Sequence, residues 1–279
     1  IHKLKKILKM KIRLISSVAL LIFIISFFYS CSDDSVTAPP APPVVQNLVK
    51  MDSGYVPGAA AIISFYAEDS LRLGYNKVYL VLYDSATNTL ITNSHIDILP
   101  VNHGHSAPVE NPGENAVEGK FPGAIVLTQA FPNGDLHWRF TFRVHNHFAT
   151  GEPEGEVQFA IPRILDNPGK FKSFTMPDST KLYVSYVLPK TPAVGMNDFE
   201  FTIHKNEPEI YPYDGSCSIE MNTQNLTNNN YPTGNVNPVH TSLGHYKGRI
   251  NLDQNGTWRI NLKIIRNSVW YDTNFEVNN

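Results

Sequence analysis

Cysteine and charge are both scarce in this chain, and several familiar catalytic motifs are missing. The 279 residues include 2 Cys, which excludes a disulfide scaffold and any cysteine-rich zinc module. Charged residues make up 17% of the chain, below the roughly 25% of an ordinary soluble domain. The 23 Lys and Arg are balanced by 25 Asp and Glu, which excludes a strongly basic nucleic-acid binder. The sequence contains no P-loop, Rossmann glycine run, G-x-S-x-G or H-E-x-x-H motif.

The first thirty residues have the order of a secretory signal. A basic head that ends at Arg13 precedes an apolar run over 14–28, and Ser30-Cys31 follows. The run is shorter than the about 20 residues of a membrane span. Phe28-Tyr29-Ser30-Cys31 resembles a bacterial lipobox, which implies cleavage after residue 30 and lipidation of Cys31. An uncleaved signal anchor is the alternative. Met10 is a plausible initiator, in which case residues 1–9 are not translated.

Residues 31–47 are predicted to form a lipid-anchored, proline-rich linker, since the prolines of 38–43 favour an extended chain. Ser32-Asp33-Asp34 resembles the acidic export signal of surface lipoproteins in Bacteroidetes. We expect an outer-membrane lipoprotein on the cell surface, or on the periplasmic face if that signal does not operate. Loss of residues 1–30 leaves 17 basic against 25 acidic residues, a balance of −8. An acidic mature chain argues further against nucleic acid.

The mature chain shows the periodicity of β-strands. Runs such as 77–83, 138–144, 199–203 and 258–264 alternate β-branched or aromatic residues with polar ones. Clusters of Gly, Pro, Asn and Asp separate them. Many short strands joined by polar turns predict an all-β chain of sandwiches.

Three short blocks occur twice, in the same order, about 120 residues apart. Residues 73–79 match 194–200, residues 121–127 match 246–252, and residues 133–139 match 255–259. A repeat of about 110 residues has the size of an immunoglobulin-like sandwich. We predict two tandem immunoglobulin-like β-sandwiches over 48–164 and 165–279.

Each block also predicts a local structure. Gly-x-Asn, at Gly74 and Gly195, supplies a turn that tolerates positive φ. Aromatic-x-Gly reads as a tight corner at the start of a strand, and Asn133-Gly134 and Asn255-Gly256 read as hairpin turns. Trp138 and Trp258 should begin the last strand pair of each sandwich and close its core.

These blocks resemble the YtkA-like domain, a small β-sandwich related to the FixH proteins of bacterial copper-oxidase assembly. The resemblance is carried in the two copies by Gly74, Asn76, His105-Ser106-Ala107-Pro108, Phe121, Gly123, Gly134, Trp138 and Arg139, and by Gly195, Asn197, Phe199, His240-Thr241-Ser242, Tyr246, Gly248, Gly256, Trp258 and Arg259. It implies a protein that handles copper or another heavy metal outside the cytoplasm. The second copy departs from the pattern, because its middle stretch over 221–231 holds one methionine among asparagines.

Six of the nine mature histidines fall between 95 and 147. His103-Gly104-His105 and His145-Asn146-His147 are H-x-H pairs, which on a strand would present both imidazoles on one face. If the pairs converge, three or four imidazoles could bind copper or zinc; otherwise these are ordinary solvated loop histidines. The candidate ligands are His95, His103, His105, His137, His145 and His147 in the first copy and His240 and His245 in the second. We expect His204 to be a surface residue and Cys217 to be an inert core thiol.

Catalysis has little support in the sequence. Asp97, Glu110 and Glu114 are scattered, and no nucleophile stands beside a histidine and an acid at a recognisable spacing. We therefore expect a non-enzymatic envelope lipoprotein that binds a transition metal, copper favoured, through histidines of the first sandwich. The alternative is a structural module that binds an envelope protein partner and no metal. An enzyme acting on envelope polymer would need a concave pocket with convergent acids.

Overall fold

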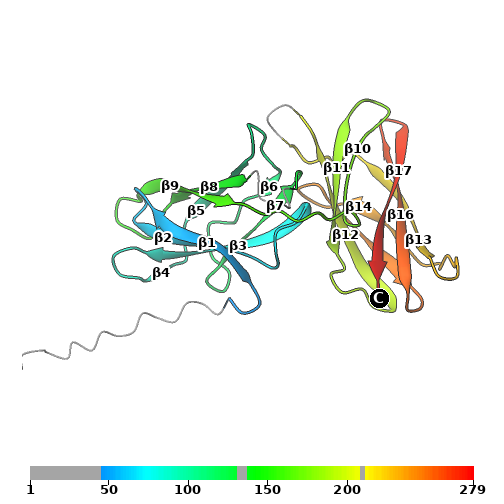
Figure 1. Ribbon diagram of the computed structural model, residues 1–279, viewed down its shortest axis with the longest axis horizontal. Coiled ribbons are helices and arrows are strands. Elements are labelled where there is room, and N and C mark those ends of the chain that lie inside the picture. Colours follow the sequence, from blue (N-terminus) through cyan, green and yellow to red (C-terminus); the bar gives the residue numbers. More distant parts are fainter. Residues whose placement is uncertain (1–44, 131–136, 208–210) are drawn as a thin grey trace, which may run out of the picture. The chain divides into compact units, whose positions relative to one another are not determined.

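A computed structural model describes residues 45–130, 137–207 and 211–279, and every regular element in them is a β-strand (Figure 1). The leader, Cys31 and most of the linker lie outside the described residues. Among the described residues, no helix is long and apolar enough to cross a membrane.

Two sheets enclose the core of the first sandwich. One has the strand order β1-β2-β3-β7-β6, with β4 paired to β3, and the other has the order β5-β8-β9. The strands are β1 (Val49–Val56), β2 (Ala61–Ala67), β3 (Gly74–Asp84), β4 (Leu90–Ile91), β5 (His95–Val101), β6 (Val109–Glu110), β7 (Phe121–Leu127), β8 (Trp138–His145) and β9 (Glu154–Ile161). Strand β8 shows why they form: Trp138, Phe140, Phe142 and Val144 are buried, and the residues between them are not. Period-two alternation places these four side chains on the inner face.

The second sandwich has its own core and repeats this arrangement. Its sheets have the orders β10-β11-β12-β15-β14 and β13-β16-β17. The strands are β10 (Phe171–Thr175), β11 (Lys181–Leu188), β12 (Gly195–Lys205), β13 (Ser218–Asn225), β14 (Val236–His240), β15 (His245–Leu252), β16 (Thr257–Arg266) and β17 (Val269–Asn278). Its buried cluster runs from Phe174 to Val277, whereas the cluster of the first sandwich runs from Val56 to Ile164.

The strand orders define the fold class. The sheets β2-β3-β7-β6 and β5-β8-β9 have the ABED and CFG orders of an immunoglobulin constant-type domain, and so do β11-β12-β15-β14 and β13-β16-β17. Strands β1 and β10 are equivalent additions beside strand A in each sandwich. The prediction of an all-β chain with immunoglobulin-like sandwiches is confirmed.

The Gly-x-Asn block closes the same loop in both sandwiches. Gly74 and Gly195 have φ of 89° and 99° and begin β3 and β12. In the first, Asn76 Oδ1 accepts the Arg72 N–H at 2.9 Å and Nδ2 donates to the Arg72 carbonyl at 2.7 Å. In the second, Asn197 makes the same two bonds to Ala193, at 2.9 and 2.7 Å. The repeated asparagine therefore ties the chain before strand B to the start of that strand.

Replacing Asn197 with alanine should lower the free energy of unfolding by about 1–3 kcal/mol, because backbone groups of Ala193 and Gly195 lose their partner. Asn261→Ala is the matched control, since its bond to Asn222 is exposed and its loss should change stability by less than about 0.5 kcal/mol. Urea unfolding monitored by circular dichroism measures both. Equal losses would contradict this role for Asn197.

The aromatic-x-Gly block acts differently from the prediction. Gly123 and Gly248 lie inside β7 and β15 rather than at corners. A Cβ added there would lie 2.8 Å from the Glu110 carbonyl oxygen and 2.4 Å from that of Val236. Each glycine thus allows strand D to approach strand E closely.

The hairpin prediction for Asn255-Gly256 is wrong, because the strands it joins, β15 and β16, belong to different sheets. Asn133-Gly134 lies outside the described residues. Trp138 and Trp258 begin the last strand pair as predicted and are fully buried. Their Nε1 atoms donate to the carbonyls of Gln129 and Gln254 at 3.0 and 3.1 Å.

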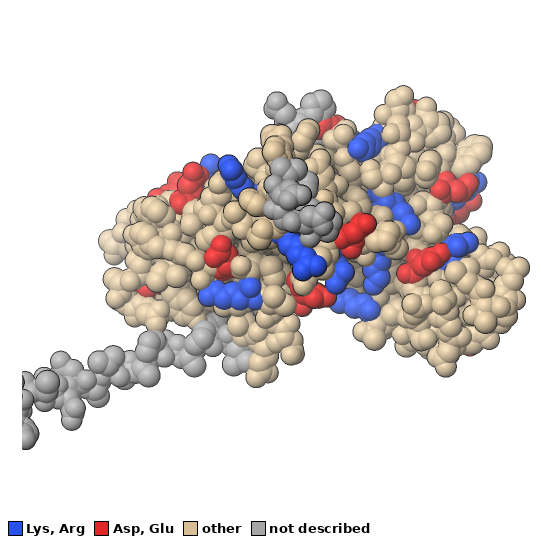
Figure 2. Space-filling view, in the orientation of Figure 1, with Lys and Arg blue, Asp and Glu red and all other residues tan. Residues whose placement is uncertain are grey.

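Charged side chains are sparse over the face shown in Figure 2, in keeping with their 17% share of the chain. Lysine and arginine nevertheless gather near the middle of that face, with some acidic side chains among them.

Candidate functional site

The strand register divides the six histidines of the first sandwich into two groups. In the antiparallel pair β5–β8, His95 lies opposite His145 and, at the other end, Val101 lies opposite Arg139. His103 and His105 follow Val101, whereas His147 follows His145. Six residue steps along a strand separate the two ends by about 20 Å. The two H-x-H pairs therefore do not converge on one metal ion.

His103 lies within a tight turn that His105 closes, and neither residue belongs to a strand. His103 and Gly104 have φ of 47° and 81°, and Asn102 and His105 exchange backbone hydrogen bonds of 2.8 and 2.9 Å. The expectation of a common strand face is therefore wrong for this pair. Both side chains are exposed, as is His137 before β8.

The other end of the sheet brings three potential metal ligands together. One ligand atom each from His145, His147 and Glu152 lies within 4.8 Å of the others, and no other such group of three occurs among the described residues. The imidazoles of His145 and His147 meet edge to face with centroids 4.6 Å apart. His145 Nε2 lies 3.6 Å from Glu152 Oε2, close to the roughly 3.4 Å between two ligands of a tetrahedral ion with bonds of about 2.0–2.1 Å.

A buried asparagine holds the backbone between the two imidazoles. Asn146 is fully buried, its Nδ2 donates to the Ala59 carbonyl at 2.9 Å, and its Oδ1 accepts the Phe148 N–H at 3.0 Å. Ser94 Oγ donates to the His145 carbonyl at 2.8 Å. These bonds hold the backbone at the start of the loop that contains Glu152, as a preorganised ligand set requires.

His95 is a further imidazole beside this group. It is the cross-strand partner of His145, and residues directly opposite in a sheet have Cβ atoms about 4.5–5.5 Å apart. Its Nε2 lies 3.4 Å from Asp97 Oδ1, and its Nδ1 lies 3.8 Å from Glu114 Oε1. His95 is not one of the three converging ligands.

Glu152 was absent from the ligands predicted from sequence. It lies five residues after His147 in the β8–β9 turn and has φ of 45°. An acid in the short turn that follows an H-x-H pair is the signal that could have revealed it.

The histidines of the second sandwich form no such group. His245 is buried, and its Nδ1 and Nε2 lie 2.5 and 2.6 Å from carboxylate oxygens of Glu200 and Glu110. Burial on its own would lower the pKa of His245, but the bonds to Glu110 and Glu200 raise it to about 9. The ring is therefore protonated at neutral pH, with both nitrogens donating, and has no free lone pair for a metal. His240 packs its ring against Gly215 and stacks on Tyr213.

His204 and Cys217 are both core residues. His204 is buried, so the expectation of a surface histidine is wrong; burial, followed by the charge of His245, lowers its pKa to about 4. Cys217 is buried and free, as expected, and burial is the main cause that raises its pKa to about 12. A thiol in that state is a poor nucleophile and a poor metal ligand.

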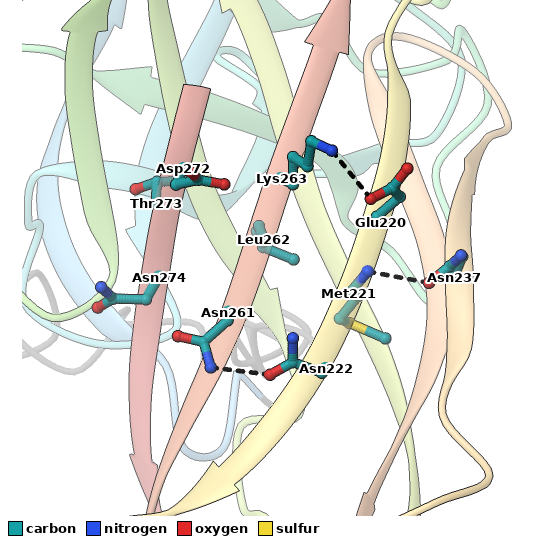
Figure 3. Close-up of a pocket in the computed structure, with 10 residues that line it drawn as sticks. All are labelled: Glu220, Met221, Asn222, Asn237, Asn261, Leu262, Lys263, Asp272, Thr273 and Asn274. Carbon is teal, nitrogen blue, oxygen red and sulfur yellow. Dashed lines mark hydrogen bonds and ion pairs between the residues drawn. The ribbon is translucent and has the colours of Figure 1, made fainter. Parts of the chain in front are cut away.

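A shallow cavity of about 600 Å³ lies on the sheet β13-β16-β17 (Figure 3). Its side chains pair across neighbouring strands: Lys263 with Glu220 at 3.3 Å and Asn261 with Asn222 at 2.9 Å. Asn237 Oδ1 accepts the Met221 N–H at 2.9 Å. These bonds engage Lys263, Asn261 and Asn237 within the sheet surface itself, and the cavity is lined mainly by such polar side chains.

Comparison with known proteins adds little to this geometry. No family model and no curated protein matches the chain. Among solved structures it is similar to a conserved domain protein from Bacillus anthracis, with 6% identity, a TM-score of 0.30, and coverage of 86% of this chain and 93% of the other. It is also similar to the titin immunoglobulin tandem A164-A165, with 12% identity, a TM-score of 0.19, and coverage of 75% and 90%. Such values transfer no function, and the YtkA-like resemblance stays a prediction.

Proposed function

We propose that the protein is a non-enzymatic, lipid-anchored protein of the bacterial cell envelope that binds a divalent transition metal, copper favoured, at His145, His147 and Glu152. The observation that carries the proposal is the convergence of these three ligand atoms within 4.8 Å of one another. Two imidazoles and a carboxylate suit Cu(II) and Zn(II), and the Irving–Williams order places Cu(II) above Zn(II) at such a site.

The surroundings of the site support binding rather than catalysis. All three ligand residues are partly or fully exposed, so the ion would be reached directly from solvent. The fixed turn around Asn146 supplies the base from which both imidazoles project. The leader and Cys31 supply the envelope location in this proposal.

Equilibrium dialysis of the mature chain carrying Cys31→Ser, followed by metal analysis, tests the site. We expect one equivalent of Cu(II) or Zn(II), with affinity reduced at least roughly 10- to 100-fold in the His145→Ala/His147→Ala variant, since perturbing even the outer shell of a metal site has that effect. Glu152→Gln should weaken binding in the same direction.

His103→Ala/His105→Ala is the matched control, because this second H-x-H pair is exposed at the opposite end of the same sheet. It should bind metal like the unaltered chain. Equal loss in both double variants, or no metal above background in the unaltered chain, would reject the metal site and leave the module that binds an envelope protein partner.

A further inference from the structure

A cleft of about 760 Å³ is lined by more basic than acidic side chains. Its walls come from residues 46–48, the region of 67–77 around the start of β3, Asn167 and Lys170 before β10, and the end of β11 with Lys190. Four basic side chains line it: Arg72, Lys77, Lys170 and Lys190. They face two acids, Glu68 and Asp69, in a mature chain whose overall balance is −8.

Most of this positive charge is not neutralised within the described residues. Lys190 forms an ion pair with Glu68, whose Oε1 also accepts the Tyr79 hydroxyl at 3.0 Å. Arg72, Lys77 and Lys170 form no ion pair with a described carboxylate. The Asp69 carboxylate accepts its neighbour Ser70 N–H at 2.6 Å.

Two of these cations lie against aromatic rings instead. Lys170 Nζ lies 4.8 Å from the centroid of the buried Tyr186 ring, and Lys77 Nζ lies 5.6 Å from that of Tyr79. The Tyr186 hydroxyl donates its hydrogen to the Pro189 carbonyl at 2.7 Å. A ligand in the cleft would therefore contact the Tyr186 ring rather than accept a hydrogen bond from its hydroxyl. An organic ligand would find apolar surface beside the ammonium groups.

The arrangement is electrostatically costly without a ligand. Lys170 is partly buried, and burial, followed by the like charge of Arg72, lowers its pKa. Two neighbouring cations repel each other, and partial burial reduces the screening by water. A bound anion would relieve both effects.

A smaller cavity of about 390 Å³ continues from the cleft and shares six lining residues with it: Glu68, Tyr75, Lys77, Tyr186, Val187 and Lys190. It reaches His245 and Glu200. There the charge of protonated His245 is already met by two carboxylates, so this end would not attract an anion. We therefore expect an anion to bind in the outer cleft, where the cations have no ion-pair partner.

We propose that this cleft binds a small anion that carries two or more carboxylate or phosphate groups, held by Arg72, Lys77 and Lys170. Arginine can hold an oxyanion through two parallel N–H bonds, while each lysine acts as a point charge. The site uses none of the proposed metal ligands, so it stands independently of the metal proposal.

Isothermal titration calorimetry of the mature chain carrying Cys31→Ser, at low ionic strength, tests this site with citrate and with pyrophosphate. We expect one-to-one binding of at least one of them, and its identity separates carboxylate from phosphate recognition. Lys170→Met and Arg72→Met should each weaken binding about 10-fold or more, as loss of a charge-assisted hydrogen bond does.

Lys181→Met is the matched control, because Lys181 Nζ also lies over a tyrosine ring, 5.2 Å from the Tyr183 centroid, and does not line the cleft. It should bind the anion like the unaltered chain. Lys77→Met supplies an independent test if Lys170→Met unfolds. The proposal is overturned if neither anion binds, or if Lys181→Met weakens binding as much as the cleft variants do.

Discussion

Replacing Arg266 with leucine should lower the free energy of unfolding by about 3–5 kcal/mol, the usual cost of removing one partner from a buried ion pair. Arg266 Nε donates to Asp214 Oδ2 at 2.7 Å, and the Asp214 side chain is 4% exposed. Burial alone would raise the pKa of Asp214, but hydrogen bonds from Ser216 and Arg266 hold it below its usual value. The variant would leave this ionised carboxylate buried without its cation.

The same guanidinium joins segments that are distant in sequence. It also contacts Asp178 and donates to Thr180 Oγ1 at 3.0 Å, both in the β10–β11 region. Asp214, in the segment before β13, accepts the Ser216 N–H at 2.9 Å, and its backbone carbonyl accepts the Tyr246 hydroxyl at 2.8 Å. Loss of Arg266 should therefore loosen both segments.

Arg259→Leu is the matched control, because Arg259 lies on the same strand and pairs with Glu276 at 2.8 Å in an exposed position. An exposed pair contributes about 0–1 kcal/mol. Urea unfolding of the two variants measures the difference. Similar losses in both would show that burial of the Asp214–Arg266 pair does not decide its contribution.

The stability of the protein should fall as the pH rises from about 6.5 to about 9, because of His245. In the folded chain the pKa of His245 is about 9, whereas an unfolded histidine has a pKa of about 6.5. Since the folded value is the higher one, the contribution is complete below pH 6.5 and is lost as the pH rises through 9. Linkage gives a total change of a few kcal/mol over that interval.

The groups that face His245 explain why its protonation stabilises the folded chain. Glu110 and Glu200 accept its two N–H bonds, Lys247 lies 3.5 Å from Glu200, and the Tyr75 ring meets the imidazole edge to face at 5.5 Å. Glu110 comes from the first sandwich and Glu200 from the second, so deprotonation also weakens a bond between the two. Two carboxylates would then remain beside an uncharged ring.

Unfolding free energies measured at intervals between pH 6 and 9.5 test this prediction. The His245→Gln variant should be less stable near pH 6.5 and should lose most of the pH dependence above it. A slope as steep in that variant as in the unaltered chain would assign the dependence to other groups.

Local patterns in the sequence were enough to predict much of the fold. The Gly-x-Asn block works through residues no more than four positions apart, so its effect is readable from the chain alone. Buried Trp138 and Trp258 follow from alternation in a single strand. The Asn255-Gly256 hairpin prediction failed because the dipeptide indicates a reversal of the chain, whereas the sheet that the next strand joins depends on distant pairings.

The candidate site depended more heavily on long-range structure. The H-x-H spacing identified His145 and His147, but only the β5–β8 register shows that His103 and His105 lie at the other end of the sheet. His204 was misjudged for a similar reason, because the segment around Tyr213 pairs with β12 beside it. The cations of the cleft come from segments about 100 residues apart, which no local spacing reveals.

The two buried tryptophans give each sandwich its own optical reporter. Trp138 and Trp258 occupy equivalent core positions, and Trp270, the third tryptophan of the chain, is 56% exposed. A Trp138→Phe or Trp258→Phe variant would leave one buried indole whose emission shifts to longer wavelength when its own sandwich opens. The duplicated core thus makes it possible to follow the opening of each half separately within the intact chain, including when metal or anion is added.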